Sequence, residues 1–268
     1  MIDYLSKERL GIMLTTRCTL RCRGCYLMIP DQKTWDADID RVIASLPKIF
    51  EIFDHFEQIC LMGGEPFLYR HIPELLAALS GYKEHFGFVR IVTNATVIPG
   101  REVLDTLRNV DYHADVRISD YGVHSHKYAE MVETLKKNGI HTTIVHYTDE
   151  EQYHGGWVEF GVNWDYRNYS PERLQKLYDN CNYKTFFNWG DYIYRCPTVS
   201  GAVQLGKLSV PDAEKIDLFS EESVESKKAK VRKLVSCPQE ACAHCDSFDA
   251  ENGVRFKAGE QIGEWDGT

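Results

Sequence analysis

Cysteine residues near the start of the chain have a spacing suited to a metal centre. Cys18, Cys22 and Cys25 lie in the segment CTLRCRGC, which gives a CxxxCxxC pattern. Cysteine thiolates hold Fe–S clusters, and a [4Fe–4S] cluster normally takes four of them. With three protein ligands, one iron keeps an open coordination position, which is typical of a metal centre that performs chemistry. A zinc knuckle and three incidental buried cysteines are the alternatives that the spacing leaves open.

A second segment whose residues could bind a ligand or take part in chemistry is Gly63-Gly64-Glu65-Pro66, which follows an apolar run. Two successive glycines let the backbone approach a bound molecule without obstruction by side chains. The carboxylate of Glu65 can accept a hydrogen bond from an ammonium group. Taken alone, the segment could equally be a tight turn.

The elements that must position these residues alternate between strand and helix. Strands are expected at residues 11–16, 58–64, 88–95, 114–120 and 141–147, and helices at 36–53, 72–82, 101–108 and 125–138, the last closed by Gly139. Such alternation predicts a parallel sheet covered by helices. Five units, or six if residues 157–161 form a strand, predict an α/β fold with a partial (β/α)5-6, TIM-like barrel. The motifs follow the carboxyl ends of the strands, where barrels of this kind place their chemistry.

The alternation stops near residue 166, and a different organisation is expected beyond it. We predict a barrel domain over residues 1–170 and a small cysteine-bearing module over residues 171–268. Within the module, residues 203–210 (VQLGKLSV) are expected to form a hairpin and residues 220–233 a charged helix.

Together, CTLRCRGC and GGEP resemble the motifs of the radical S-adenosylmethionine (SAM) enzyme superfamily, and the resemblance extends over residues 9–150. It implies that Cys18, Cys22 and Cys25 ligate a [4Fe–4S] cluster whose open iron is chelated by the amino and carboxylate groups of SAM. The GGEP segment would bind the cofactor, with Gly63, Gly64 and Glu65 at the methionyl ammonium and Pro66 completing the motif.

The resemblance also implies further cofactor contacts. Many family members have an aromatic residue before the last cysteine that contacts adenine, whereas this chain has Gly24 there, and Tyr26 is the expected substitute. Residues at the ends of the third and fourth strands resemble family positions that contact the carboxylate and ribose of SAM: Thr93, Asn94, Ser119 and Asp120. Polar caps at strand ends are the alternative for these four residues.

The C-terminal cysteines resemble a Twitch module, the shorter relative of the SPASM domain, which holds an auxiliary [4Fe–4S] cluster. The expected ligands are Cys181, Cys196, Cys242 and Cys245, and Cys237 is a fifth candidate. A structural zinc site built from the same thiolates is the alternative. Cys60, within the second predicted strand, is expected to be a small buried residue.

The family chemistry implies a 5′-deoxyadenosyl radical that abstracts hydrogen from a substrate, with an electron donor such as flavodoxin or ferredoxin. An auxiliary cluster would accept an electron from the substrate radical, which favours dehydrogenation of a small hydroxylated metabolite, a sugar or cyclitol. In length and cysteine layout the chain resembles the aminocyclitol dehydrogenase of aminoglycoside biosynthesis. Such an oxidation needs a proton acceptor. Its candidates, each of which could also be an ordinary polar residue, are His124, His126, His146, Tyr147 and Arg167.

Other functions stay open on the sequence. Peptide modification, as epimerase or crosslinking maturase, is one, although no leader-recognition extension is expected before the barrel; a glycyl-radical activating enzyme is another. A non-catalytic Fe–S or zinc scaffold protein is the alternative outside enzymes. The aromatic residues between Tyr147 and Tyr194 suit a sugar-like ligand or the core that joins barrel and module.

Composition restricts location and partners. The 268 residues carry a net charge of −9, which disfavours a nucleic-acid partner. The first ten residues are charged and lack an apolar signal region, and no apolar window long enough to cross a membrane is present. With nine cysteines in such a chain, we expect a cytoplasmic protein in a reducing compartment, without a membrane partner and with a small-molecule substrate.

Overall fold

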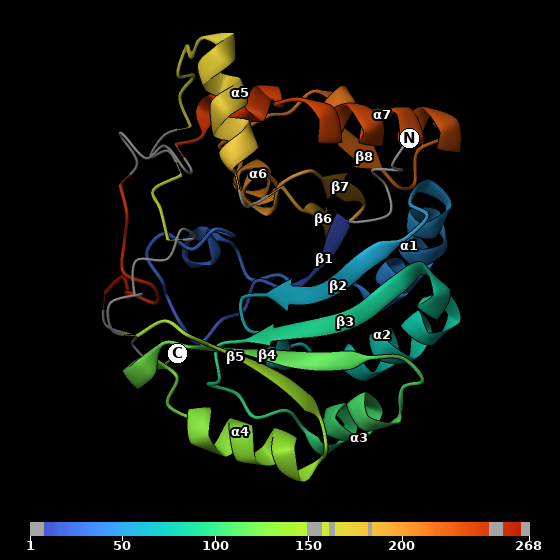
Figure 1. Cartoon of the computed structure of the whole chain (residues 1–268), viewed down its shortest axis with the longest axis vertical. Coiled ribbons are helices and arrows are strands. Elements are labelled where there is room, and N and C mark those ends of the chain that lie inside the picture. Colours follow the sequence, from blue (N-terminus) through green and yellow to red (C-terminus); the bar gives the residue numbers. More distant parts are fainter. Residues whose placement is uncertain (1–7, 149–156, 161–163, 182–183, 247–253, 264–268) are drawn as a thin grey trace.

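A curved sheet of eight strands runs through the described part of the protein, a computed structural model that describes residues 8–148, 157–160, 164–181, 184–246 and 254–263 (Figure 1). The strand order is β5-β4-β3-β2-β1-β6-β7-β8. Neighbours from β5 to β6 are parallel, whereas β7 and β8 are antiparallel additions. The strands are β1 (Glu8–Thr15), β2 (Phe56–Gly63), β3 (Phe86–Thr93), β4 (Ala114–Asp120), β5 (His141–His146), β6 (Phe186–Trp189), β7 (Tyr192–Tyr194) and β8 (Lys215–Asp217).

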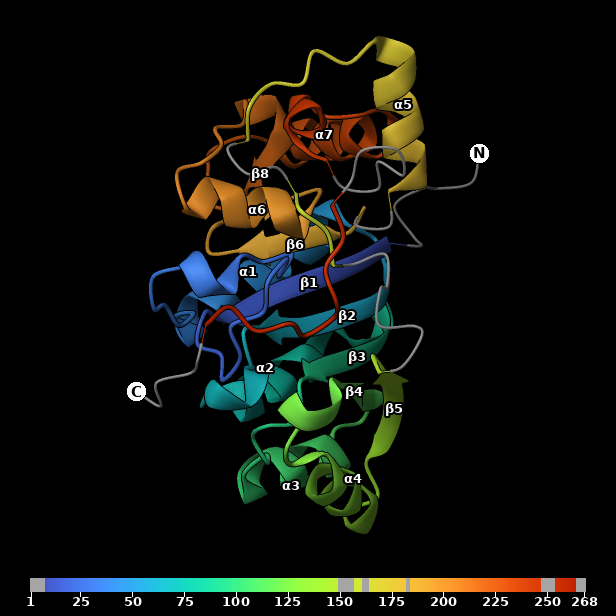
Figure 2. The same ribbon diagram turned by 90° about the vertical axis from the view of Figure 1, so that its left-hand side faces the viewer.

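Helices α1 to α4 cover one side of the parallel strands, and α5 to α7 gather around β6 to β8 (Figures 1 and 2). The helices are α1 (Ile39–Ile52), α2 (Ile72–Leu79), α3 (Arg101–Asn109), α4 (Tyr128–Lys137), α5 (Pro171–Asn180), α6 (Pro197–Gln204) and α7 (Val224–Ser236). Short 3-10 helices are η2 (Ile29–Asp31), η3 (Pro66–Leu68), η4 (Ser80–His85), η5 (Gly122–His124), η7 (Asp212–Glu214) and η8 (Glu240–His244).

Alternation along each strand separates two environments. Ile12, Leu61 and Ile118 are fully buried in the core beneath the helices. Because neighbouring side chains of a strand point to opposite faces, Met13 and Arg117 face the interior of the barrel. The predicted α/β fold with a partial TIM-like barrel is confirmed, as are the five strands and four helices predicted for the first half, within a few residues at their ends. Gly139 closes α4 with φ +67°, as predicted.

The sixth parallel strand is not the predicted one. In the described part of residues 157–161, Val158 forms only an isolated bridge with Arg255. Its neighbours bond to the same C-terminal segment, with Phe256 N donating to Trp157 O at 2.8 Å. The sixth position belongs to β6, whose four residues are all buried and which pairs with β1. The prediction failed because the strand with which a short apolar segment pairs is decided by contacts between residues far apart in the sequence.

The predicted hairpin at residues 203–210 is also wrong. Pro197 occupies the first turn of α6, which continues to Gln204. Gly206, with φ +67°, then ends the helix, and the Lys207 N–H donates to Ala202 O at 2.9 Å. A glycine in the left-handed region closes helices as well as hairpins. The observed hairpin joins β6 and β7 through Gly190, φ +61°.

Sheet and core both continue past residue 170. Ile193, Ile216 and Leu234 belong to the same buried cluster as the residues of β1 to β4. A boundary near residue 170 stays a prediction. No helix in the described residues combines the length and apolar character needed to cross a membrane.

The seam between β1 and β6 generates a testable prediction. Gly11 pairs with Phe187, and a Cβ atom on Gly11 would lie 2.7 Å from Cε2 of that buried ring. We expect Gly11→Ala to destabilise the fold by about 1–3 kcal/mol, because the ring has no space to move into. Gly81→Ala, whose Cβ would meet nothing within 4 Å, is the matched control in thermal unfolding. Equal melting temperatures for the two variants would contradict the described seam, and Phe187→Leu should recover part of the loss.

Candidate functional site

Cys18, Cys22 and Cys25 line one cavity at the carboxyl ends of the parallel strands. The structure therefore brings the three predicted thiols together with most of the predicted cofactor residues. Those that share the cavity are Tyr26, Gly63, Gly64, Thr93, Asn94 and Ser119. Glu65, Pro66 and Asp120 do not line it, so their predicted contacts with a cofactor stay predictions. Leu20, Leu27, Ile29, Pro30, Met62, Val92, Tyr121 and Trp157 complete the lining.

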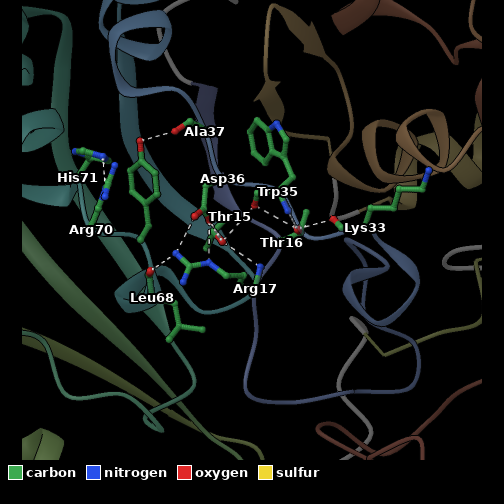
Figure 3. Close-up of polar contacts among 11 residues, drawn as sticks. Thr15, Thr16, Arg17, Lys33, Trp35, Asp36, Ala37, Leu68, Arg70 and His71 are labelled. Carbon is green, nitrogen blue, oxygen red and sulfur yellow. Dashed lines mark hydrogen bonds and ion pairs between the residues drawn. The ribbon is translucent and has the colours of Figure 1, made fainter. Parts of the chain in front are cut away.

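The base of the cysteine loop is fastened by polar contacts (Figure 3). Thr16 Oγ1 donates to Lys33 O at 2.8 Å and accepts from the Trp35 N–H at 2.7 Å. Arg17 pairs with Asp36 at 2.9 Å, and it also donates to Leu68 O. The two ends of the loop are thus held beside each other, and the cysteines between them start from a fixed frame.

Gly63 and Gly64 permit a close approach of backbones. A Cβ on Gly63 would lie 3.1 Å from Thr15 N, and one on Gly64 would lie 2.7 Å from Cβ of Cys18. Gly64 N donates to Thr15 O at 2.8 Å. Both positions require glycine because the cysteine loop packs directly against their backbone. Their contact with a ligand stays a prediction.

Glu65 is fully buried and holds the end of β3. Its carboxylate accepts from Thr93 Oγ1 at 2.9 Å and from the Asn94 N–H at 2.9 Å, and the Phe67 N–H donates at 3.2 Å. Desolvation raises the pKa of Glu65 to about 7, although these hydrogen bonds favour the charged form. Glu65 thus lies behind the cavity wall and positions two residues that line it.

The three thiols fit an iron–sulfur cluster with an open iron. Burial raises the pKa of each thiol, that of Cys22 to about 12, and neighbouring cysteines add to the effect at Cys18 and Cys22. Thiolates so placed need a bound cation. The described lining of this cavity contains no further Cys, His or carboxylate. Among the described residues, only one group of three possible metal-ligand atoms lies within 4.8 Å of one another, and it contains no cysteine. The sulfurs of Cys18, Cys22 and Cys25 are therefore further apart than the ligands of a single zinc ion.

Two side-chain amides donate hydrogen bonds to the thiol sulfurs, in addition to the Leu20 N–H, which lies 3.4 Å from Cys18 Sγ. Asn94 Nδ2 lies 3.6 Å from Cys18 Sγ, and Gln261 Nε2 lies 3.3 Å from Cys22 Sγ. Gln261 belongs to residues 254–263, which run against the cysteine loop (Figure 2), with Arg23 N donating to Glu260 O at 2.7 Å. Hydrogen bonds to sulfur tune the potential of a cluster. No pattern in the sequence predicts this contact of the C-terminal residues.

Gly24 has a structural reason to precede the third cysteine. Its φ is +67°, and a Cβ there would lie 2.7 Å from the Phe256 ring. Tyr26 is half-buried in the cavity wall, with its hydroxyl 3.8 Å from Met62 Sδ. Its contact with adenine stays a prediction.

A second cavity gathers the C-terminal cysteines. Cys181, Cys196, Cys242 and Cys245 all line it, together with Lys184 and the buried Arg195. Two cations beside four thiols suit a bound group that carries negative charge. Cys237 does not line this cavity; it follows α7, with Sγ 3.5 Å from Lys233 O. Cys60 is buried within β2, as predicted.

Among the candidate proton acceptors, Tyr147 has a ring that packs on the cavity wall. Its ring stacks on Tyr121 at 5.1 Å, and Tyr121 lines the cavity. His124 and the exposed His126 do not line it, and His146 pairs with Asp120 at 2.7 Å. Arg167 makes a bidentate pair with Asp246, 2.7 Å for each hydrogen bond.

Part of the aromatic-rich region belongs to the core, whereas its predicted contact with a sugar-like ligand stays a prediction. Phe186, Phe187 and Trp189 are buried in core clusters, whereas Trp157 lines the cysteine cavity. Tyr166 is exposed, and Tyr153 lies outside the described residues.

The trio of close ligand atoms lies at the opposite end of β4 and β5 and consists of His113, Asp115 and His141. Arg90 already holds the Asp115 carboxylate with two hydrogen bonds. The carboxylate is therefore part of an ion pair that links β3 to β4.

Residues 12–152 match the profile of the Radical SAM superfamily. A GTP 3',8-cyclase of Campylobacter fetus subsp. fetus (strain 82-40) is 32% identical over 88 residues, which cover 31% of this chain and 24% of that enzyme. The structure of BtrN in complex with AdoMet and 2-DOIA superposes with a TM-score of 0.56 at 12% identity, covering 95% of this chain and 96% of BtrN. The structure of anSMEcpe with bound AdoMet gives 0.51 at 16% identity, covering 85% and 82%. Both structures share the fold.

Glu65 generates a pH-dependent prediction. Because its pKa in the folded state is raised, its contribution to stability is present below about pH 4.3 and is lost as the pH rises through about 7. Thr93→Val removes a donor to the charged form, so it should cost about 2 kcal/mol at pH 8.5 and about 1 kcal/mol at pH 5.5. Thermal unfolding at the two pH values measures this, with Thr106→Val, on the outside of α3, as the pH-independent control. An equal loss at both pH values would refute the assignment.

Proposed function

Since the chain belongs to the radical SAM superfamily, we propose that this enzyme oxidises a hydroxylated carbon of a small metabolite, a sugar or a cyclitol, to a carbonyl group. The family implies a [4Fe–4S] cluster and SAM. Oxidation of an alcohol removes one hydrogen atom from carbon, one proton from the hydroxyl group and one electron from the resulting radical. The enzyme must therefore supply a hydrogen acceptor, a base and an electron acceptor.

The cysteine cavity supplies the first of these. Cys18, Cys22 and Cys25 would hold the cluster, while Gly63 and the Glu65-positioned Asn94 form the wall where SAM would lie. When bound, the reduced cluster and SAM supply an organic radical that removes hydrogen from an unactivated carbon. Tyr26 and Trp157 line the same cavity, and a bound cofactor would pack against their rings.

The observation that carries the oxidative assignment is the convergence of Cys181, Cys196, Cys242 and Cys245 on one cavity. Four thiols supply the full ligand set of a closed [4Fe–4S] cluster, which exchanges electrons without binding substrate. No three of their sulfurs lie within 4.8 Å of one another, a spacing that favours a cluster over a single zinc ion. The flanking Arg195 favours the negative charge that such a cluster carries.

Tyr147 is the proton acceptor that placement favours. It lies beside the aromatic wall, and the Arg117 guanidinium donates a hydrogen bond to its hydroxyl oxygen at 2.6 Å. General bases must lie within hydrogen-bond reach of the proton they take, and a substrate inside the barrel would meet this hydroxyl group.

The radical chemistry is tested by product release. We expect anaerobically reconstituted protein to release 5′-deoxyadenosine from SAM when dithionite is added. Cys22→Ala should abolish the release and lose about four irons, whereas Cys60→Ala, which changes a buried cysteine outside both cavities, should retain both. Absence of 5′-deoxyadenosine from well-loaded protein would favour the scaffold alternative.

The auxiliary cluster is tested by a second pair of variants. Cys181→Ala should lose about four irons and keep SAM cleavage. It should no longer oxidise any cyclitol or sugar for which the parent enzyme gives a product lighter by two hydrogen atoms in mass spectra. Cys237→Ala, in the same region but outside the cavity, should behave as the parent. Zinc in place of iron, or loss of iron in Cys237→Ala alone, would overturn the ligand set.

A further inference from the structure

A positive charge inside the barrel has no carboxylate partner among the described residues. Arg117 lies in β4 between Val116 and Ile118, which are fully buried beneath the helices, so its side chain faces the interior. Its charge acts on Tyr26, in the cysteine loop, and on Cys60, in β2. The positive charge lowers the pKa of both groups, so the guanidinium lies inside the barrel within electrostatic reach of the cysteine loop and of β2.

The hydrogen bonds of Arg117 are incomplete. One Nη atom donates to the Tyr147 hydroxyl oxygen at 2.6 Å, while the Nε atom is buried and has no acceptor among the described residues. The carboxylate nearest along the strand, Asp115, is already held by Arg90 and accepts from Thr143 Oγ1 at 3.3 Å. A buried donor without an acceptor is costly, and native proteins rarely retain one without a role.

We propose that Arg117 binds an oxyanion, a carboxylate or phosphate group, of the substrate. This inference rests on the proposed function, because it assumes that the substrate occupies the barrel interior. A guanidinium edge forms paired, charge-assisted hydrogen bonds with such groups. The substrate class becomes a hydroxylated small molecule with an anionic end, such as a sugar phosphate or a sugar acid.

The position of Arg117 also sets where the reacting carbon lies. Ser119, two residues further along the same face of β4, lines the cysteine cavity, and two residues of a strand span about 7 Å. Tyr147 accepts a hydrogen bond from Arg117 and stacks on Tyr121 of the cavity wall. A monosaccharide with its anionic group on Arg117 would place hydroxyl groups beside Tyr147 and a C–H bond toward the cavity.

Direct anion binding tests the proposal without any radical chemistry. Holoenzyme is titrated anaerobically with inorganic phosphate and, separately, with acetate, at constant ionic strength and in the presence of SAM. We expect phosphate or acetate to raise the melting temperature of the parent, and Arg117→Met to weaken the binding by at least about tenfold. Arg101→Met, which removes a highly exposed arginine from α3, should bind the anions as the parent does.

Further outcomes separate the possible roles of the guanidinium. Arg117→Met should nearly keep its melting temperature without anions, because it loses one hydrogen bond to Tyr147 but also removes a half-buried charge that has no carboxylate partner among the described residues. It should also keep the affinity for SAM. A parallel loss of SAM affinity would overturn the proposal, since Arg117 would then serve the carboxylate of the cofactor. Absence of anion binding to the parent would also overturn it.

If Arg117→Met does not fold, Arg117→Lys should show weakened anion binding, and unchanged binding refutes the assignment. Failure to release 5′-deoxyadenosine would instead refute the proposed function and leave the anion result standing.

Discussion

The hydrogen bonds of the buried Glu65 carboxylate join the end of β2 to the end of β3, and much of the cavity geometry depends on them. Asn94, fixed through its backbone N–H, turns its side-chain amide toward the sulfur of Cys18. The Glu65 N–H donates to Arg17 O, directly before that cysteine. One desolvated group thus sets the relative positions of three strand ends, and its raised pKa is the cost of placing a carboxylate where water does not reach.

Close packing of backbones is the second constraint. Gly63 and Gly64 bring the cysteine loop against the end of β2, and the contacts between Thr16 and Lys33 close the loop from its other side. The loop is therefore held from outside, so its thiols can face the cavity without having to stabilise the loop themselves. This division suits a site that must exchange ligands at one metal position while its frame stays in place.

The sequence predicts those parts of the site that depend on local spacing. Three thiols within eight residues, and two glycines at a strand end, lie together because short segments place them there. The same holds for the five strands before residue 148, whose hydrophobic periodicity is local. The pairing of β6 with β1 and the contact of Gln261 with Cys22 were not predictable, because each selects a partner far along the chain. Arg117 could not be predicted as a site residue, because whether an inward-facing arginine of β4 has a carboxylate partner depends on residues of other strands.

Residues 254–263, which contact the cysteine loop, are synthesised long after the loop itself. A ribosome delivers Cys22 long before Gln261, the residue that donates to its sulfur. Until residues 254–263 have been synthesised, Cys22 lacks this hydrogen bond, although the rest of the cysteine loop is already present. The surroundings of Cys22 are therefore complete only after residues 254–263 have folded back onto the cysteine loop.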